Sequence, residues 1–176
     1  MRKLILYCAV SLDYFIADIE GSVEWLTNNK YLSPEEDYGY AAFYDQIDTT
    51  IMGNNTYKQV LGFGVPFPYP DKRNFVISHS KHRDTEYVRF FDSNCIEYIN
   101  NLKATKGKDI WLVGGGQLNT FFHDHGLIDQ LILTFIPVQL KNGTPLFVAD
   151  NALSTYKLSK SKTYKNGITQ KIFNKK

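Results

Sequence analysis

The feature of this sequence best suited to chemistry is a run of three glycines, residues 114–116, which follows a short apolar segment at residues 110–113. A stretch compatible with a helix, residues 117–123, comes directly after it. Glycine lets the main chain bring its N–H groups close to a ligand, and a helix start favours negative charge. The turn therefore predicts a phosphate or pyrophosphate site, and hence a nucleotide cofactor. The alternative is a purely structural turn, because the spacing matches neither Gly-x-Gly-x-x-Gly nor a P-loop.

A second group with chemical capability is His123, Asp124 and His125, since imidazole and carboxylate groups bind metal ions. The same residues fit the polar end of a helix that Gly126 terminates, where histidines interact favourably with the helix dipole. No further ligand stands at a suitable spacing, so we expect no metal at this position.

Alternating strands and helices are expected to position these residues. Such alternation is typical of an α/β fold with a mixed, mostly parallel sheet, and Asn166-Gly167 predicts an antiparallel hairpin that closes the chain. Ser33 and Pro34 are expected to begin the first helix. The predicted strands are residues 4–10, 49–52, 74–78, 87–91, 110–113, 131–138, 156–161 and 168–173, and the predicted helices are residues 33–47, 54–61, 92–102 and 117–123.

Composition limits the classes of protein that fit. The 176 residues predict a single domain over residues 1–176, and 43% hydrophobic with 15% aromatic residues predicts a folded core. A net charge of +2 argues against nucleic acid as a partner. Cys8 and Cys95 are too few for a disulfide framework. No apolar run is long enough for a membrane span or a signal peptide, so we expect a cytoplasmic protein.

Several segments together resemble a known family. In their order and spacing they resemble the dihydrofolate-reductase-like superfamily, and most closely the reductase (C-terminal) domain of the riboflavin-biosynthesis deaminase-reductase. The resemblance implies a three-layer fold with a mixed sheet of about eight strands between helices, and a site at the carboxyl ends of those strands. The segments are Ser-Leu-Asp-Tyr-Phe-Ile-Ala at 11–17, Gly-Ser-Val-Glu-Trp at 21–25, Ile-Met-Gly-Asn-Asn-Thr-Tyr at 51–57, Val-Gly-Gly-Gly at 113–116, Leu-Ile-Asp-Gln-Leu at 127–131 and Gly-Thr-Pro-Leu-Phe at 143–147.

The resemblance also implies NADPH as the cofactor, and roles for the residues around it. Gly114 and Gly115 correspond to a pair that the superfamily joins by a cis peptide bond. Ala17 is expected near the nicotinamide amide, and Ser78 and His79 near the adenosine end. The main chain of Val113, Gly114, Gly115, Gly116, Gln117 and Leu118, and a second phosphate-binding turn at Gly53, Asn54, Asn55 and Thr56, complete the implied cofactor site.

For the substrate, the resemblance implies a small pyrimidine or pteridine-like molecule. Trp25 and Phe15 are expected beside it. Counting back from Gly53, Asp37 takes the place of the substrate-binding acid of dihydrofolate reductase, where a carboxylate anchors N–H groups or relays a proton. The alternative for Asp37 is an acid in the first turn of a helix, favoured by the dipole.

The sequence departs from the family at three positions. Asn54 and Gln117 replace residues that are usually basic, which weakens the case for a 2′-phosphate and leaves NADH possible. Basic residues at 79–83, among them Lys81 and Arg83, are predicted to compensate. Tyr14 stands where glycine is usual, which predicts a stiffer loop or a narrower cleft.

The resulting functional prediction is an NADPH-dependent reductase similar to 5-amino-6-(5-phosphoribosylamino)uracil reductase. A true dihydrofolate reductase is the first alternative. A nucleotide-binding relative without catalysis is the second, and Tyr14 and Asn54 favour it. The aromatic surplus and the resemblance predict a homodimer.

Overall fold

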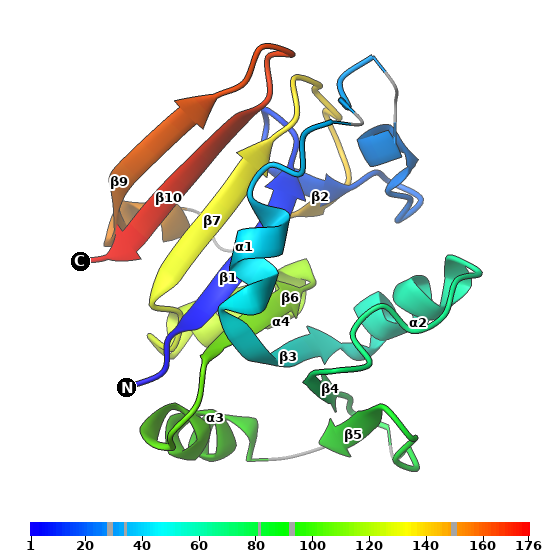
Figure 1. Cartoon of the computed structure of the whole chain (residues 1–176), viewed down its shortest axis with the longest axis vertical. Coiled ribbons are helices and arrows are strands. Elements are labelled where there is room, and N and C mark those ends of the chain that lie inside the picture. The colour runs from blue at the N-terminus through cyan, green and yellow to red at the C-terminus, as the bar shows by residue number, and fades with distance from the viewer. Residues whose placement is uncertain (28–29, 34, 81, 92–93, 149–150) are drawn as a thin grey trace.

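Ten strands form two sheets in the computed structural model, which describes residues 1–27, 30–33, 35–80, 82–91, 94–148 and 151–176. The strands are β1 (Leu4–Val10), β2 (Phe15–Ala17), β3 (Ile47–Gly53), β4 (Arg73–Ile77), β5 (Val88–Phe91), β6 (Asp109–Gly114), β7 (Gln130–Phe135), β8 (Thr144–Pro145), β9 (Tyr156–Thr163) and β10 (Thr169–Lys175). Eight of them make one sheet in the order β5-β4-β3-β6-β1-β7-β10-β9 (Figure 1).

The strand directions confirm the predicted fold class. In the order of the sheet, the strands β5, β4, β3, β6, β1 and β7 each pair in parallel with their neighbours in this group. The strand β10 pairs antiparallel with both β7 and β9. The parallel strands therefore end at one common edge, where ligands bind in open α/β sheets. The separate pair of β2 with β8 was not predicted, because strands of three and two residues are too short to show periodicity.

Helices cover both faces of the sheet. The helices are α1 (Tyr40–Asp45), α2 (Asn54–Gly62), α3 (Cys95–Ala104) and α4 (Gly116–Asp124), with 3-10 turns η1 (Glu24–Thr27) and η2 (Ala152–Thr155). On one face, Phe43 of α1 joins a largely aromatic cluster with Trp111 of β6. On the other face, Ile99 of α3 and Phe122 of α4 pack on aliphatic residues of β1, β6 and β7.

The predicted helix at residues 33–47 is wrong in its extent, because α1 begins only at Tyr40. Two successive residues with left-handed backbone, Tyr38 at φ 53° and Gly39 at φ 80°, stop any helix that starts earlier. Ile47 belongs instead to β3, where it is fully buried. Pro34, and the predicted cap residues Asp92 and Ser93 of α3, lie outside the described residues.

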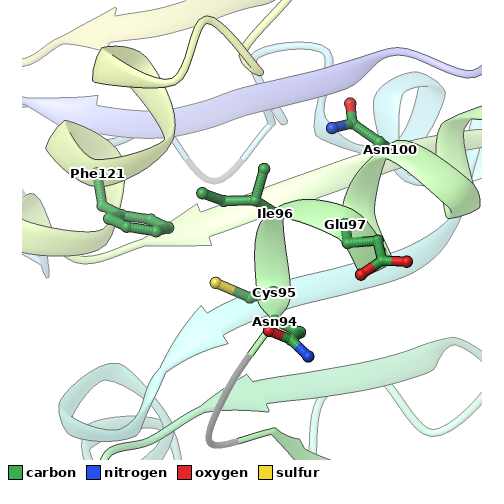
Figure 2. A pocket seen from close by; sticks show the side chains of 6 residues that line it. All are labelled: Asn94, Cys95, Ile96, Glu97, Asn100 and Phe121. Carbon is green, nitrogen blue, oxygen red and sulfur yellow. The ribbon is translucent and has the colours of Figure 1, made fainter.

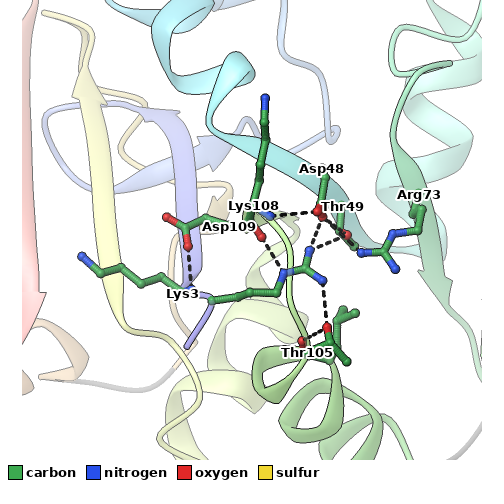
Figure 3. A network of polar contacts seen from close by, with 9 residues as sticks. Lys3, Asp48, Thr49, Arg73, Thr105, Lys108 and Asp109 are labelled. Carbon is green, nitrogen blue, oxygen red and sulfur yellow. Dashed lines mark hydrogen bonds and ion pairs between the residues drawn. The ribbon is translucent and has the colours of Figure 1, made fainter.

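Buried cations join the elements at the opposite, amino edge of the sheet. The Arg2 guanidinium, only 1% exposed, pairs with Asp48 and donates to Thr49 Oγ1 at 2.8 Å (Figure 3). Burial acts to raise the pKa of Asp48, but hydrogen bonds from Thr49 and from the Lys108 amide, with the charge of Arg2, hold that pKa below its usual value. These contacts fasten β1 to β3 and β6, far from the carboxyl edge.

The strand β9 forms one open edge of the large sheet. After Tyr156, every residue of this strand is exposed. Three of its eight residues are lysines, Lys157, Lys160 and Lys162. The Lys162 Nζ lies 4.0 Å from the centre of the Tyr164 ring in the hairpin turn.

Candidate functional site

Two glycine turns meet at the carboxyl edge, where β3 and β6 end side by side. Gly53 precedes the first turn of α2, and a Cβ added to it would lie 3.8 Å from the Gly114 carbonyl oxygen. The Gly115 N–H donates to Thr56 Oγ1 at 3.2 Å. A cis peptide bond joins Gly114 to Gly115, as the resemblance implied. The two predicted phosphate-binding turns are therefore in direct contact, and the amino ends of α2 and α4 lie beside each other.

The third glycine of the run is required by packing against β8. A Cβ on Gly116 would lie 2.3 Å from the Pro145 carbonyl oxygen, which is shorter than any real contact of this kind. Directly before β8, a Cβ on Gly143 would likewise lie 2.1 Å from the Ala17 carbonyl oxygen. Phe15 pairs with Pro145 in β2–β8. The small sheet thereby fixes Ala17, predicted on the nicotinamide side, and Phe15, predicted beside the substrate, against the start of α4.

Two buried amide oxygens near these turns have no hydrogen-bond partner among the described residues. Asn119 of α4, 1% exposed, donates from Nδ2 to the Leu146 carbonyl at 3.0 Å, yet its Oδ1 is unpaired. The Asn54 Oδ1 at the start of α2 is also buried and unpaired. A buried acceptor without a donor is costly, and such atoms mark a place for a ligand donor. Asn119 was missed by the sequence analysis, where its only signal is a polar residue on the buried face of α4.

The adjoining strand β4 places Ser78 and His79 at the same edge. Ser78 is buried and its N–H donates to the Phe91 carbonyl at 2.9 Å, whereas His79 is exposed. Of the basic residues predicted to compensate for the missing cations, His82 stacks on Phe90 with ring centres 4.8 Å apart. Arg83 is exposed, and Lys81 lies outside the described residues.

A pocket of about 490 Å³ opens between the start of α3 and Phe121 of α4. Figure 2 shows the Cys95 sulfur and the Ile96 side chain pointing toward the Phe121 ring, which leaves an apolar slot between the two helices. Burial raises the pKa of the Cys95 thiol. The polar residues that line the pocket are Asn94, Glu97 and Asn100. A flat apolar slot with amide and carboxylate groups around it suits a heterocycle that carries N–H donors. The sequence analysis did not identify this pocket.

Asp37 is exposed and directs both carboxylate oxygens at main-chain amides of α1. Its Oδ1 accepts from Gly39 N at 2.8 Å and its Oδ2 from Ala41 N at 2.9 Å. Hydrogen bonds from Ala41 and Gly39 hold the pKa of Asp37 below its usual value. The charge of Asp37 acts on the Tyr7 hydroxyl of β1, although burial is the main reason that the pKa of Tyr7 rises to about 12. The carboxylate therefore stays ionised at neutral pH, and no hydrogen bond joins it to the glycine turns within the described residues.

Trp25 and Tyr14 belong to the loops that flank the carboxyl edge. The Trp25 indole Nε1 in η1 is buried and has no acceptor among the described residues, so it holds a free donor. Tyr14 has a left-handed backbone at φ 65°, the conformation for which glycine is favoured. Its ring packs edge-on against Phe135 of β7, with ring centres 5.3 Å apart.

The histidines at the end of α4 have neighbours within the fold. His123 Nδ1 lies 3.3 Å from the Tyr156 hydroxyl, and His125 Nδ1 lies 2.8 Å from the Phe121 carbonyl oxygen. The part of the chain that the structure describes contains no group of three or more side chains arranged to hold a metal ion. In the same described part, no helix has the length and apolar character needed to cross a membrane.

The residues at the carboxyl edge fit a dinucleotide. Two helix starts offer main-chain N–H groups and positive dipole ends to a pyrophosphate. The pocket between α3 and α4 has a volume of about 490 Å³, and Asn54 and Asn119 keep unpaired acceptors in the first turns of α2 and α4. Ala17 pairs with Thr144 in the small sheet, and the Pro145 carbonyl of that sheet faces Gly116 at the start of α4.

Comparison with known proteins gives consistent matches. The model of the RibD C-terminal domain family matches residues 69–170. The uncharacterised protein YwjB of Bacillus subtilis (strain 168) is 41% identical over 148 residues, which is 83% of each chain. The uncharacterised protein YyaP of the same organism is 32% identical over 184 residues, which is 98% of this chain and 94% of YyaP.

Solved structures show the same architecture. A putative riboflavin biosynthesis protein from Shewanella sp. PV-4 superposes with a TM-score of 0.87 at 28% identity, over 99% of each chain. The diaminohydroxyphosphoribosylaminopyrimidine deaminase/5-amino-6-(5-phosphoribosylamino)uracil reductase from Thermotoga maritima superposes with a TM-score of 0.72 at 15% identity. That match covers 99% of this chain and 57% of the Thermotoga chain, and it supports the fold alone.

Proposed function

The chain belongs to the RibD C-terminal domain family, and on this premise we propose that it is a reductase that transfers a hydride from a reduced nicotinamide dinucleotide to a small pyrimidine or pteridine-like molecule. The observation that carries the proposal is the junction of the two glycine turns, where Gly115 N–H meets Thr56 Oγ1 between the starts of α2 and α4. The sequence predicts NADPH as the donor and leaves NADH open. The predicted homodimer and cytoplasmic location stay predictions.

The chain's own groups have distinct tasks in this proposal. Main-chain N–H groups at the starts of α2 and α4 bind the pyrophosphate. The pocket lined by Cys95 and Phe121 takes the adenosine end. The small sheet β2–β8 holds Ala17 on the nicotinamide side. When bound, the reduced nicotinamide supplies the hydride, and the protein supplies alignment and exclusion of water.

On the substrate side, the ionised state of Asp37 limits its chemistry. A carboxylate whose pKa is lowered accepts hydrogen bonds from ring N–H groups, but it holds no proton to give at neutral pH. We therefore assign Asp37 to anchoring the heterocycle rather than to protonating it. Trp25 contributes the complementary group, since its free indole N–H donates to a ring carbonyl.

The two cysteines allow a direct test of the cofactor position. Burial raises the pKa of the Cys8 thiol to about 12, so Cys8 is expected to be inert to a thiol reagent, whereas Cys95 lines the pocket. We expect the native protein to react at Cys95 alone, and saturating NADPH or NADH to slow that reaction at least about fivefold. The Cys95→Ser variant is the control, because it should not react while folded.

Unchanged labelling of Cys95 under saturating dinucleotide, with binding shown separately by a thermal shift, would move the adenosine end out of this pocket. Absence of any thermal shift with either dinucleotide would overturn the reductase proposal and favour a family member that does not bind the cofactor. Oxidation of the dinucleotide with 5-amino-6-(5-phosphoribosylamino)uracil, or with dihydrofolate in the alternative function, then identifies the hydride acceptor. Binding without turnover of either acceptor favours the non-catalytic relative, for which Tyr14 and Asn54 argue.

A further inference from the structure

We propose that the dinucleotide site of this chain selects a cofactor with a free adenosine 2′-hydroxyl, NADH, over its 2′-phosphorylated counterpart. The inference rests on the proposed function and concerns which of the two dinucleotides that site accepts. It departs from the sequence prediction of NADPH, and it follows from three features of the residues around the turns and the pocket.

The first feature is the unpaired oxygen of Asn54. This oxygen is buried at the start of α2, at the position where the resemblance implies a cation for the 2′-phosphate. A buried amide oxygen is stabilised by a hydrogen-bond donor and destabilised by another acceptor. A ribose hydroxyl is a donor, whereas a phosphate dianion offers acceptors only. The Asn54 oxygen therefore complements the free hydroxyl, and the neutral side chain supplies no positive charge to a phosphate.

The second feature is the charge of the pocket between α3 and α4. Its polar lining consists of amides and one carboxylate, Glu97, and includes no lysine or arginine. None of the ion pairs among the described residues involves Glu97, so its negative charge is not neutralised. In Rossmann-type dinucleotide sites, an acidic residue near the ribose accompanies a free 2′-hydroxyl and an arginine accompanies a 2′-phosphate, and the same charge argument applies here. With the adenosine in this pocket and the pyrophosphate at the helix starts, as proposed, the ribose would join the two, and we assign Glu97 and Asn54 to its 2′-oxygen.

The third feature is the placement of the nearby cations. Gln117 at the start of α4 is exposed and uncharged. Arg89 pairs with Asp84 at 3.5 Å, and His82 stacks on Phe90. Among the described residues, no arginine or lysine lines the pocket. A 2′-phosphate needs charge-assisted hydrogen bonds to repay its desolvation, and this part of the chain does not provide them.

The test uses two nucleotides that differ only in the 2′-phosphate. Adenosine 5′-monophosphate and adenosine 2′,5′-bisphosphate are titrated into the full chain by calorimetry at one ionic strength, and NADH and NADPH follow. We expect the ligands with the free hydroxyl to bind about tenfold more tightly or better within each pair. Equal affinity, or tighter binding of the 2′-phosphorylated ligands, would overturn the inference and restore the compensation predicted for residues 79–83.

Substitutions at two positions, 54 and 97, locate the cause of the preference. Asn54→Arg is expected to reverse the preference by supplying the missing cation, whereas Asn54→Asp, which keeps an acceptor, should retain it. Glu97→Gln should reduce the ratio of affinities severalfold, and Glu86→Gln, an exposed acid away from the pocket, serves as its matched control. If neither Asn54→Arg nor Glu97→Gln changes the ratio of the two affinities, the preference does not arise from Asn54 and Glu97. If no nucleotide binds at all, the proposed function itself fails.

Discussion

Replacing Gly116 by alanine is expected to destabilise the protein, although alanine is the better helix former. The added Cβ would lie 2.3 Å from the Pro145 carbonyl oxygen, and contacts shorter than 3.0 Å essentially do not occur. The two segments must therefore separate by at least about 0.7 Å, the difference between these distances. Forcing extra volume into a packed site of this kind costs about 1–3 kcal/mol.

The helix preference offsets only part of this cost. Alanine is favoured over glycine by at most about 1 kcal/mol in a helix interior, and Gly116 is the first residue of α4. We therefore expect the free energy of unfolding to fall by about 1–2 kcal/mol. For a chain of this length, this corresponds to a decrease in Tm of roughly 2–8 °C.

The matched control is Gly62→Ala at the end of α2. A Cβ at this position meets no atom within 4 Å, so only the helix preference acts, and we expect a gain of about 0.5–1 kcal/mol. Urea titration at pH 7 measures both variants against the parent chain. If Gly116→Ala is as stable as the parent, or if both alanines shift stability in the same direction, the reasoning from the Pro145 contact is refuted.

Two further predictions concern the amino edge of the sheet. The pKa of Asp48 is lowered in the folded state, so its contribution to stability is present above the unfolded pKa of about 3.9 and is lost as the pH falls below it. Urea midpoints measured from pH 7 to pH 3 should therefore fall less steeply in Asp48→Asn, and equal slopes would contradict this. The Lys103 side chain is 8% exposed, and its Nζ lies 2.7 Å from Asp129 Oδ2. Replacing Lys103 by methionine should lower the free energy of unfolding by about 3 kcal/mol, whereas replacing the exposed Lys106 by methionine should change it little. A loss below about 0.5 kcal/mol at Lys103 would show that this ion pair is not needed.

The sequence predicted the large sheet well, because its strands carry strong local signals. Several parallel strands contain a short apolar run, such as residues 4–10 and 110–113, and the hairpin has Asn166-Gly167 at its turn. The helix at residues 33–47 failed because the pattern Ser-Pro-Glu-Glu satisfies every local rule for a helix start. The left-handed backbone at Tyr38 and Gly39 is held by distant contacts, such as Gln170 Nε2 to the Tyr38 carbonyl at 2.8 Å, which no local window contains.

The candidate site divides in the same way. The glycine turns could be predicted because glycines between an apolar run and a helix-compatible stretch indicate a close-approach turn. The cis peptide at Gly114 was implied by the resemblance. The pocket was not visible, because Cys95 and Phe121 come from different helices and neither is unusual in its own segment. The unpaired oxygen of Asn54 is likewise a property of burial, which a sequence does not state.

The lysines of β9 have a consequence for association between copies of this chain. An open sheet edge carries unpaired main-chain groups that template the addition of another strand. If two β9 edges met, the side chains of Lys157, Lys160 and Lys162 would bring like charges together. Natural sheets resist edge-to-edge growth by this kind of repulsion. The predicted homodimer must therefore use another surface. Removing these charges is expected to turn this edge strand into a site where fibrillar assembly begins.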